Sequence, residues 1–374
     1  MNQISKKALH VDTQKRSMDY AAFFLVLVLG IFGLVMLYST SAYNGSVKFN
    51  DAGYYLKKQL FATSIGIAAM FFVSQIDYHF FARYATIGYL LSLFLSGIVL
   101  AVGKSINGSK RWLYLGPLSF QPSEFAKIAV ILFLAYMISN SKKKITSLFS
   151  LVKILFLILP IVALVGINNL STAIIILGIA VILVFVSNPK YLQFIALGVL
   201  GIGFIAIFLS LEAYRLERIA IWLNPENYEK GYQTLQGLYA IGSGGLFGVG
   251  LGNSLQKLGF VPEAQNDMIF SIICEELGLI GALILILIFG LLIWRFMVIA
   301  SHAPDLLGAL IVTGIMGHIA IQVILNIAVV TNTIPNTGIT LPFISYGGTS
   351  VMFLLAEMGL ALSVSRSCTN RVRA

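Results

Sequence analysis

The chain has 374 residues, of which 58% are hydrophobic and only 11% are charged, and its formal net charge is +10. Its mean hydropathy is +0.90, which excludes a water-soluble globular protein, because a fold of this size could not bury so much apolar surface. Repeated apolar runs near the roughly 20 residues that cross a bilayer predict an all-α polytopic membrane protein. Cys274 and Cys368 fall at different levels of this arrangement and imply no disulfide framework.

In chain order, the apolar runs predict ten transmembrane helices. They cover residues 19–40, 59–76, 84–103, 120–139, 152–168, 170–187, 191–211, 267–295, 306–330 and 349–366. Residues 19–366 then form one membrane domain, with residues 1–18 and 367–374 as cytoplasmic tails. The fifth and sixth spans could be one broken helix, but the apolar run over residues 151–186 is too long for a single crossing.

The positive charge is distributed unevenly among the connecting segments. With the N-terminus placed inside, the cytoplasmic segments carry far more Lys and Arg than acids, which are Asp12, Asp19, Asp77, Asp305 and Glu357. This asymmetry follows the positive-inside rule. The basic balance therefore orients the protein and does not indicate a nucleic-acid partner.

A long glycine-rich segment joins the seventh and eighth spans. Residues 212–266 are predicted to form a large extracytoplasmic loop, and Asp267 lies where the chain enters the eighth span. A loop this long in a compact chain is usually functional or disordered, and apolar residues such as Leu246 and Phe247 argue against disorder. A single carboxylate at a helix start beside such a loop is a candidate for chemistry.

Basic and aromatic residues gather on the same predicted side: Lys110, Arg111 and Trp112 in the second outer loop, and Arg215 and Arg218 before the long loop. The arginines could bind phosphate oxygens through bidentate contacts. They could equally anchor helices at the lipid headgroups.

Polar side chains also occur within the predicted spans. They are Glu124 and Lys127 in the fourth, Glu275 and Glu276 in the eighth, and His318, Gln322 and Asn326 in the ninth. Glu124 and Lys127 have the spacing of an ion pair on one helix face, and the ninth-span residues recur every four positions, which predicts one stripe facing the bundle interior. A charge at mid-membrane costs roughly 2.5–3.5 kcal/mol on insertion scales, so these acids need partners or protons. Hydrogen bonding between helices is the alternative to a ligand site.

The last outer loop, residues 332–350, combines prolines, glycines and hydroxyls, Ser345 among them. This composition predicts irregular backbone at membrane depth, which is tolerated only when it is buried in protein or lines a wet cavity. Several other chemistries have no motif here. The glycine run at 242–252 matches no nucleotide-binding pattern, no serine lies in a G-x-S-x-G turn, and the four histidines lack metal-ligand spacing.

Six motifs, taken together, resemble the SEDS family, whose members include FtsW, RodA and SpoVE. They are Trp112 with QPSEFAK at 121–127, GYQ at 231–233, GLGNS at 250–254, PEA at 262–264 with DMIF at 267–270, EELG at 275–278, and LPFISYGG at 341–348. The likeness extends over roughly residues 18–366. Thr340, where RodA-type members usually have proline, makes the chain more similar to the division-type FtsW or sporulation-type SpoVE.

The resemblance implies a peptidoglycan glycosyltransferase of the bacterial plasma membrane, acting at the division septum. It would polymerise lipid II with a class B penicillin-binding protein and other divisome proteins as partners. The family's essential acid matches Asp267, and the implied substrate contacts are Lys110, Arg111, Trp112, Glu124, Lys127, Arg215, Arg218, Gln233, Glu263, Glu275, Gln322, Asn326 and Ser345. The chain departs from the family at Gln265-Asn266, where His-Thr is usual, and at Asn169, where many members have a carboxylate.

The implied mechanism makes Asp267 a general base that takes a proton from the GlcNAc 4-hydroxyl of lipid II, while outer cations stabilise the leaving diphosphate. No cofactor is identified, but a divalent cation, Mg²⁺ or Mn²⁺, could share that role with Asp267 as its ligand. A lipid II flippase and a non-catalytic divisome scaffold are the alternative functions. Polar residues concentrate in the outer half of the predicted spans, which favours chemistry over transport.

Overall fold

Nine helices among the described residues are long and apolar enough to cross a membrane. The computed structural model describes residues 18–106, 109–115, 118–141, 148–188, 190, 192–194 and 219–368. The nine helices are α1 (Tyr20–Phe49), α2 (Tyr54–Gln75), α4 (Ala85–Val102), α5 (Pro122–Ser139), α6 (Leu148–Asn168), α7 (Leu170–Ser187), α11 (Ile269–Ser301), α12 (Leu306–Val330) and α13 (Gly348–Ser367). They match nine of the ten predicted spans. Residues 195–211, most of the predicted seventh span, lie outside the described residues.

Two helices continue well beyond their predicted ends. Helix α1 extends to Phe49 and α11 to Ser301, whereas α7 and α12 have the predicted bounds. The fifth and sixth spans are confirmed as two helices. Asn169 lies between α6 and α7 and caps α7, because its Oδ1 accepts a hydrogen bond from Thr172 N at 3.2 Å.

The connections contain structure that the sequence analysis did not predict. A short helix, α3 (Tyr78–Arg83), follows α2, and the segment after α4 forms an antiparallel sheet of β1 (Lys104–Ile106), β2 (Ser109–Leu115) and β3 (Leu118–Phe120) in that order. The long segment predicted as a loop contains two 3₁₀ turns (Pro225–Asn227, Glu229–Gly231) and helix α10 (Tyr232–Ser243). These elements were missed because strands of three to seven residues and a single glycine-containing helix leave little periodicity in the sequence.

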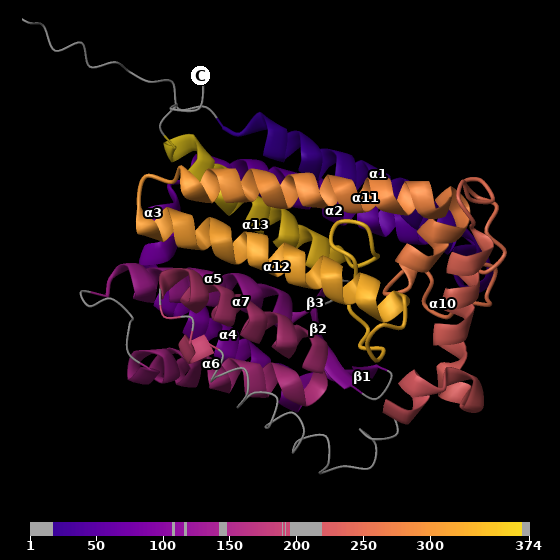
Figure 1. Cartoon of the computed structure of the whole chain (residues 1–374), viewed down its shortest axis with the longest axis horizontal. Helices are drawn as coiled ribbons and strands as arrows, with labels where there is room; N and C mark the ends of the chain where they lie inside the picture. The colour runs from indigo at the N-terminus through magenta and orange to yellow at the C-terminus, as the bar shows by residue number, and fades with distance from the viewer. Residues whose placement is uncertain are drawn as a thin grey trace, which may run out of the picture.

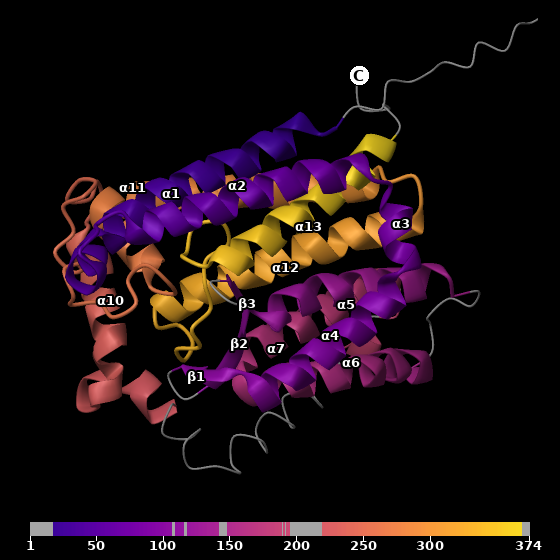
Figure 2. The same ribbon diagram turned by 180° about the vertical axis from the view of Figure 1, so that it is seen from behind.

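The membrane-crossing helices lie side by side with their connections at two opposite ends (Figure 1). The strands, α10 and residues 331–347 gather at one end, here called the Asp267 end, and α3 lies at the other in both views (Figure 2). Helices α5, α12 and α13 are the most buried in the bundle. Helix α13 packs closely on α2, where a Cβ on Gly66 would lie 2.6 Å from the Leu355 side chain and where small residues let the backbones approach.

Residues 331–347 form irregular backbone that is largely inside the protein. Phe343 is buried and has a φ of +65°, and its carbonyl lies so close to α1 that a Cβ on Gly33 would be 2.4 Å from it. Gln59 of α2 is 2% exposed, and its Oε1 accepts from Gly347 N at 3.1 Å. Irregular backbone in this loop is therefore confirmed, and its depth in the membrane stays a prediction.

Candidate functional site

Asp267 lies in the turn before α11, outside the membrane-crossing helices, and is 9% exposed. Among the described residues, no other side chain gives its carboxylate a hydrogen bond or an ion pair. The pKa of Asp267 is raised to about 7, chiefly by burial and to a smaller extent by the Glu263 carboxylate, while the backbone N–H groups of Asp267 and Met268 act in the opposite direction. A carboxyl group that titrates near neutral pH can take up and release a proton during a reaction.

Two predicted residues hold the backbone around Asp267. Asn326 of α12 donates from Nδ2 to the Asp267 carbonyl at 2.8 Å and to the Ile339 carbonyl at 2.6 Å. Ser345 donates to the Asn266 carbonyl at 2.6 Å. The turn is thus joined to α12 and to the last loop through main-chain acceptors, and its own carboxylate is not used in these contacts.

Residues near the turn form further side-chain hydrogen bonds, including contacts with α1 and with the last loop. Gln265, which stands where the family usually has histidine, accepts at Oε1 from Asn44 of α1 at 3.1 Å. Gln233 of α10 accepts from Asn336 at 3.3 Å. Glu263 is exposed, has a φ of +54°, and accepts from the Asn266 side chain. Of these residues, only Glu263 presents a charged group to the exterior beside Asp267.

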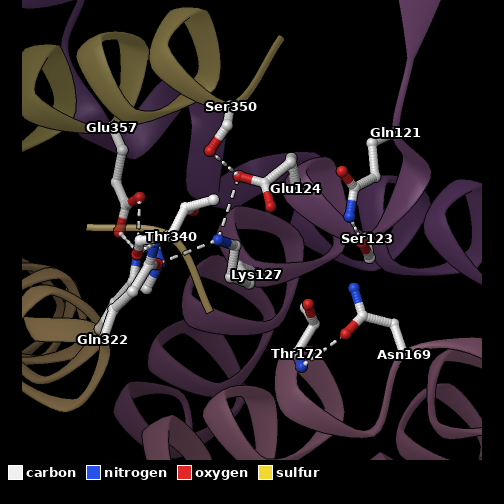
Figure 3. A network of polar contacts seen from close by, with 11 residues as sticks. Gln121, Ser123, Glu124, Lys127, Asn169, Thr172, Gln322, Thr340, Ser350 and Glu357 are labelled. Atoms are coloured by element: carbon white, nitrogen blue, oxygen red, sulfur yellow. Dashed lines mark hydrogen bonds and ion pairs between the residues drawn. The ribbon is translucent and has the colours of Figure 1, made fainter. Parts of the chain in front are cut away.

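Glu124 and Lys127 of α5 form the predicted ion pair, with their charged atoms 3.0 Å apart and both side chains buried (Figure 3). Ser350 of α13 donates to Glu124 at 2.8 Å, and Lys127 donates to Gln322 Oε1 of α12 at 3.3 Å. The pair therefore links three helices.

His318 continues this network deeper into the bundle. Gln322 accepts from Lys127 at Oε1 and donates from Nε2 to the Thr340 carbonyl at 3.0 Å, which sets the orientation of its amide. His318 Nε2 then faces Gln322 Oε1 at 2.9 Å, and Nδ1 faces the Glu357 carboxylate at 2.8 Å. Each ring nitrogen of His318 therefore faces an oxygen of a buried side chain, and the ring joins α12 to α13.

This network also corrects one assignment. Glu357 was counted with the cytoplasmic acids, but it lies in the middle of α13, is 1% exposed and pairs with His318. The prediction failed because α13 was considered without its neighbour α12. The stripe of His318, Gln322 and Asn326 faces the interior as predicted, and its side chains are engaged by internal hydrogen bonds.

Glu275 and Glu276 both bind side chains or backbone of the segment that precedes Asp267. Glu275, a predicted substrate contact, is 3% exposed and accepts from Ser254 Oγ and from Leu255 N, the latter at 3.1 Å. Glu276 forms an ion pair with Lys257 at 2.6 Å. Lys257 was missed, although it is the one charged residue in the sequence between positions 231 and 262, and that isolation was a signal for a buried partner.

The predicted cations belong to a different part of the same end. Lys110, Arg111 and Trp112 lie on β2, and Arg111 Nε donates to the Asn168 carbonyl at 2.7 Å. Neighbouring Asn169 caps α7. Arg215 and Arg218 lie outside the described residues. Within the described ranges, no three His, Cys, Asp or Glu side chains come together in a group that could hold a metal ion.

Comparisons with known proteins agree with this architecture over nearly the whole chain. The family model described as "Cell cycle protein", covering FtsW, RodA and SpoVE, matches residues 19–370. The stage V sporulation protein E of Bacillus subtilis (strain 168) is 42% identical, with 95% of this chain and 99% of that protein covered. The probable peptidoglycan glycosyltransferase FtsW of Trichlorobacter lovleyi is 36% identical over 93% of each chain.

Two solved structures share the fold. A chain in a peptidoglycan synthase complex, described as coordinating polymerization and crosslinking, has a TM-score of 0.82 and 30% identity and covers 95% of this chain and 99% of its own. RodA of Thermus thermophilus has a TM-score of 0.70 and 29% identity, with 96% and 99% covered. With the motifs, the helices and the Asp267 turn all in family order, the chain belongs to the SEDS family of FtsW, RodA and SpoVE.

Proposed function

We propose that this chain is a peptidoglycan glycosyltransferase that polymerises lipid II for septal cell-wall synthesis. The observation that carries the proposal is Asp267, a buried carboxylate with a pKa near 7 and no side-chain partner among the described residues. The names of the FtsW relatives and the solved synthase complex support the same activity. The septal role rests on the likeness to FtsW and SpoVE.

Asp267 acts as the general base of the transfer. The GlcNAc 4-hydroxyl of lipid II gives its proton to the carboxylate, and its oxygen bonds to the anomeric carbon of the growing strand's terminal MurNAc. The bond from that carbon to the diphosphate breaks, and undecaprenyl diphosphate leaves with the electron pair. Attack opposite the leaving group inverts the anomeric centre from α to β. The outer cations proposed to stabilise the departing charge are Lys110, Arg111, Lys127, Arg215 and Arg218.

A divalent cation is the alternative use of the same carboxylate. Glu263 lies close enough to affect the pKa of Asp267, and Mg²⁺ is commonly held by one or two carboxylates together with substrate phosphates. Mg²⁺ or Mn²⁺ bound by this pair would supply charge stabilisation for the diphosphate. Polymerisation measured with EDTA and then with added Mg²⁺ separates the two roles, because a metal-free general base retains activity in EDTA.

The proposed partner is a class B penicillin-binding protein, which would cross-link the strands, together with other divisome proteins. The solved synthase complex combines polymerization with crosslinking. The chain would work in the plasma membrane, with the Asp267 end outside, where the strands are assembled.

The test is polymerisation of labelled lipid II by the purified chain with its cognate penicillin-binding protein, in moenomycin to silence contaminating polymerases. Asp267→Asn is expected to lower the rate by about 10²–10⁴-fold, the contribution of a general base. Glu229→Gln, which removes an exposed acid from the same segment, is the matched control and should keep wild-type activity.

Equal glycan ladders from wild type and Asp267→Asn would remove Asp267 as the base. Absence of product from a folded wild-type complex would favour the flippase or the scaffold. Vesicle assays of lipid II translocation would then separate these two, because only a flippase moves lipid II between leaflets.

A further inference from the structure

Residues 244–260, called the lobe here, have an apolar exposed surface next to the start of α11. The exposed large side chains are Leu246, Phe247, Val249, Leu251, Leu255, Leu258 and Phe260. Phe247 is 79% exposed and Leu255 is 68% exposed. The one charged residue of the lobe, Lys257, is buried and paired with Glu276. Exposure of such a contiguous apolar surface to water would be unfavourable.

The lobe backbone takes up hydrogen bonds that a break in α11 leaves open. The helix is interrupted at Gly278, which has a φ of 69° and a ψ of −172°. Val249 N donates to the Glu275 carbonyl at 2.9 Å, and Leu279 N donates to the Gly245 carbonyl at 2.9 Å. Protein groups thus satisfy backbone that could not be left open in lipid.

The depth of the lobe relative to the membrane follows from its contacts with α1 and α11. Asp19 at the start of α1 pairs with Arg295 of α11. Charged side chains near helix ends reach the membrane interface, so we assign this pair to one boundary of the hydrocarbon core. Ser39 of α1 donates to Glu276 of α11 at 2.7 Å. Ser39 lies 20 residues after Asp19 along α1, and Glu276 lies 19 residues before Arg295 along α11. At 1.5 Å per residue both helices span about 30 Å, which is the thickness of the hydrocarbon core. The Lys257–Glu276 pair therefore lies at the opposite boundary of that core.

An apolar groove connects the lobe to the membrane-facing helices. Its volume is about 330 Å³, and its lining includes Phe247 of the lobe, Phe32 of α1, and Leu277, Ile284 and Ile288 of α11. Among the exposed side chains, Ile284 of α11 continues the lobe surface into the membrane-crossing part of the bundle. The lobe and the lipid-facing surface are thus one continuous apolar area.

We propose that the lobe is embedded in the bilayer leaflet at the Asp267 end, where Phe247 and Leu255 contact phospholipid acyl chains. The buried charge pair, the internal backbone bonds and the depth along α1 and α11 all fit this environment. The lobe leads through Val261 into the Asp267 turn, so its insertion holds Asp267 at a set height above the leaflet. The segment is a lipid-contact element rather than an aqueous loop.

Spin-label accessibility in the full chain tests this proposal. A Cys368→Ser background leaves Cys274, which is 7% exposed, as the remaining cysteine. Phe247→Cys and Leu255→Cys are labelled separately and reconstituted in phosphatidylcholine nanodiscs without a partner. Phe72→Cys on α2, where the native side chain is 66% exposed, is the lipid-facing control. Glu229→Cys is the control for water exposure.

We expect labels at 247 and 255 to collide more with oxygen than with a water-soluble nickel chelate, as at position 72. A nickel preference like that at 229 would overturn the proposal by placing the lobe in water. Low collision with both probes would also overturn it, because the lobe would then be covered by protein, such as a second copy. Monodisperse elution of each labelled variant shows that the chain is folded, and two separate positions guard against a local distortion.

Discussion

The Asp267 turn and the Lys257–Glu276 pair contain buried carboxylates nine residues apart, yet their environments are opposite. Glu276 has Lys257 at 2.6 Å and Ser39 at 2.7 Å. Asp267 is almost as buried, but contacts around it are made to its main chain, and no described side chain neutralises its carboxylate. Burial alone therefore does not distinguish a structural acid from a reactive one. The presence or absence of a partner does.

The largest expected effect comes from removing the charge of each acid by the same kind of substitution. Glu276→Gln leaves the buried Lys257 ammonium without its counter-ion and should lower the free energy of unfolding by roughly 3–5 kcal/mol. Asp267→Asn should leave stability unchanged or raise it, because it removes a desolvated charge. Thermal unfolding of both variants in the same nanodiscs measures the difference.

A second substitution serves as the control for this pair. Combining Glu276→Gln with Lys257→Met removes both charges and should recover a large part of the lost stability, since no unpaired charge remains. Equal destabilisation by Glu276→Gln and Asp267→Asn would contradict the distinction between the two regions.

The next prediction concerns Gln322, which joins the buried residues Lys127 and His318 to the last loop near Asp267. Gln322→Leu removes the hydrogen bond to the Thr340 carbonyl and leaves that buried acceptor without its partner, so we expect a loss of about 1–3 kcal/mol. Polymerisation should fall as well, because Thr340 adjoins Ile339, which shares Asn326 with Asp267. Unfolding and lipid II assays on one preparation measure both effects.

Ile324→Ala is the matched control on the same helix, since Ile324 is 64% exposed and faces away from the network. Its stability should stay within about 0.5 kcal/mol of wild type. If Gln322→Leu behaved in the same way, the network would be a passive means of burying charges with no role in holding the last loop.

Most of the fold could be predicted from the sequence because hydropathy is a local property. Span bounds at 170–187 and 306–330 coincide with α7 and α12, since polar residues close each run. The break at Gly278 could not be predicted in this way. It depends on a segment some thirty residues earlier, whose backbone replaces the missing helical partners.

Prediction of the site was limited in the same way, because the contacts of a side chain with other helices cannot be read from its own segment. The spacing of Glu124 and Lys127 was sufficient to predict their pairing, because both lie on one helix. The pairing of His318 with Glu357 joins two helices, and no pattern within either helix indicates it. Glu275 has a place in a family motif, but its engagement with Ser254 is visible only in three dimensions.

A smaller effect concerns the pH dependence of the proposed reaction. Because burial raises the pKa of Asp267 to about 7, the base form predominates above that pH, and the rate should rise from pH 5 to pH 8 with a midpoint near 7. Glu263 raises this pKa through its charge, so Glu263→Gln should move the midpoint to lower pH. We expect a shift below about one unit, because Glu263 is exposed and solvent screens it.

Initial rates of lipid II polymerisation across this range measure the midpoint. Glu229→Gln is the control, because it removes an exposed acid that is not among the groups shifting the pKa of Asp267. A midpoint that moves upward in Glu263→Gln would contradict the assignment of the titration to Asp267.

The smallest effect is expected at Asn169, where many family members have a carboxylate. In this chain the Asn169 side chain caps α7 by accepting from Thr172 N at 3.2 Å, and aspartate is as good a cap as asparagine. Asn169→Asp should therefore change stability by no more than about 0.5 kcal/mol and leave polymerisation unchanged. Asn169→Ala should cost about 0.5–2 kcal/mol, because the cap is lost. A marked gain of activity in Asn169→Asp would show instead that a carboxylate at this helix start acts on the substrate, and Asp267 would no longer be the one reactive acid of this end.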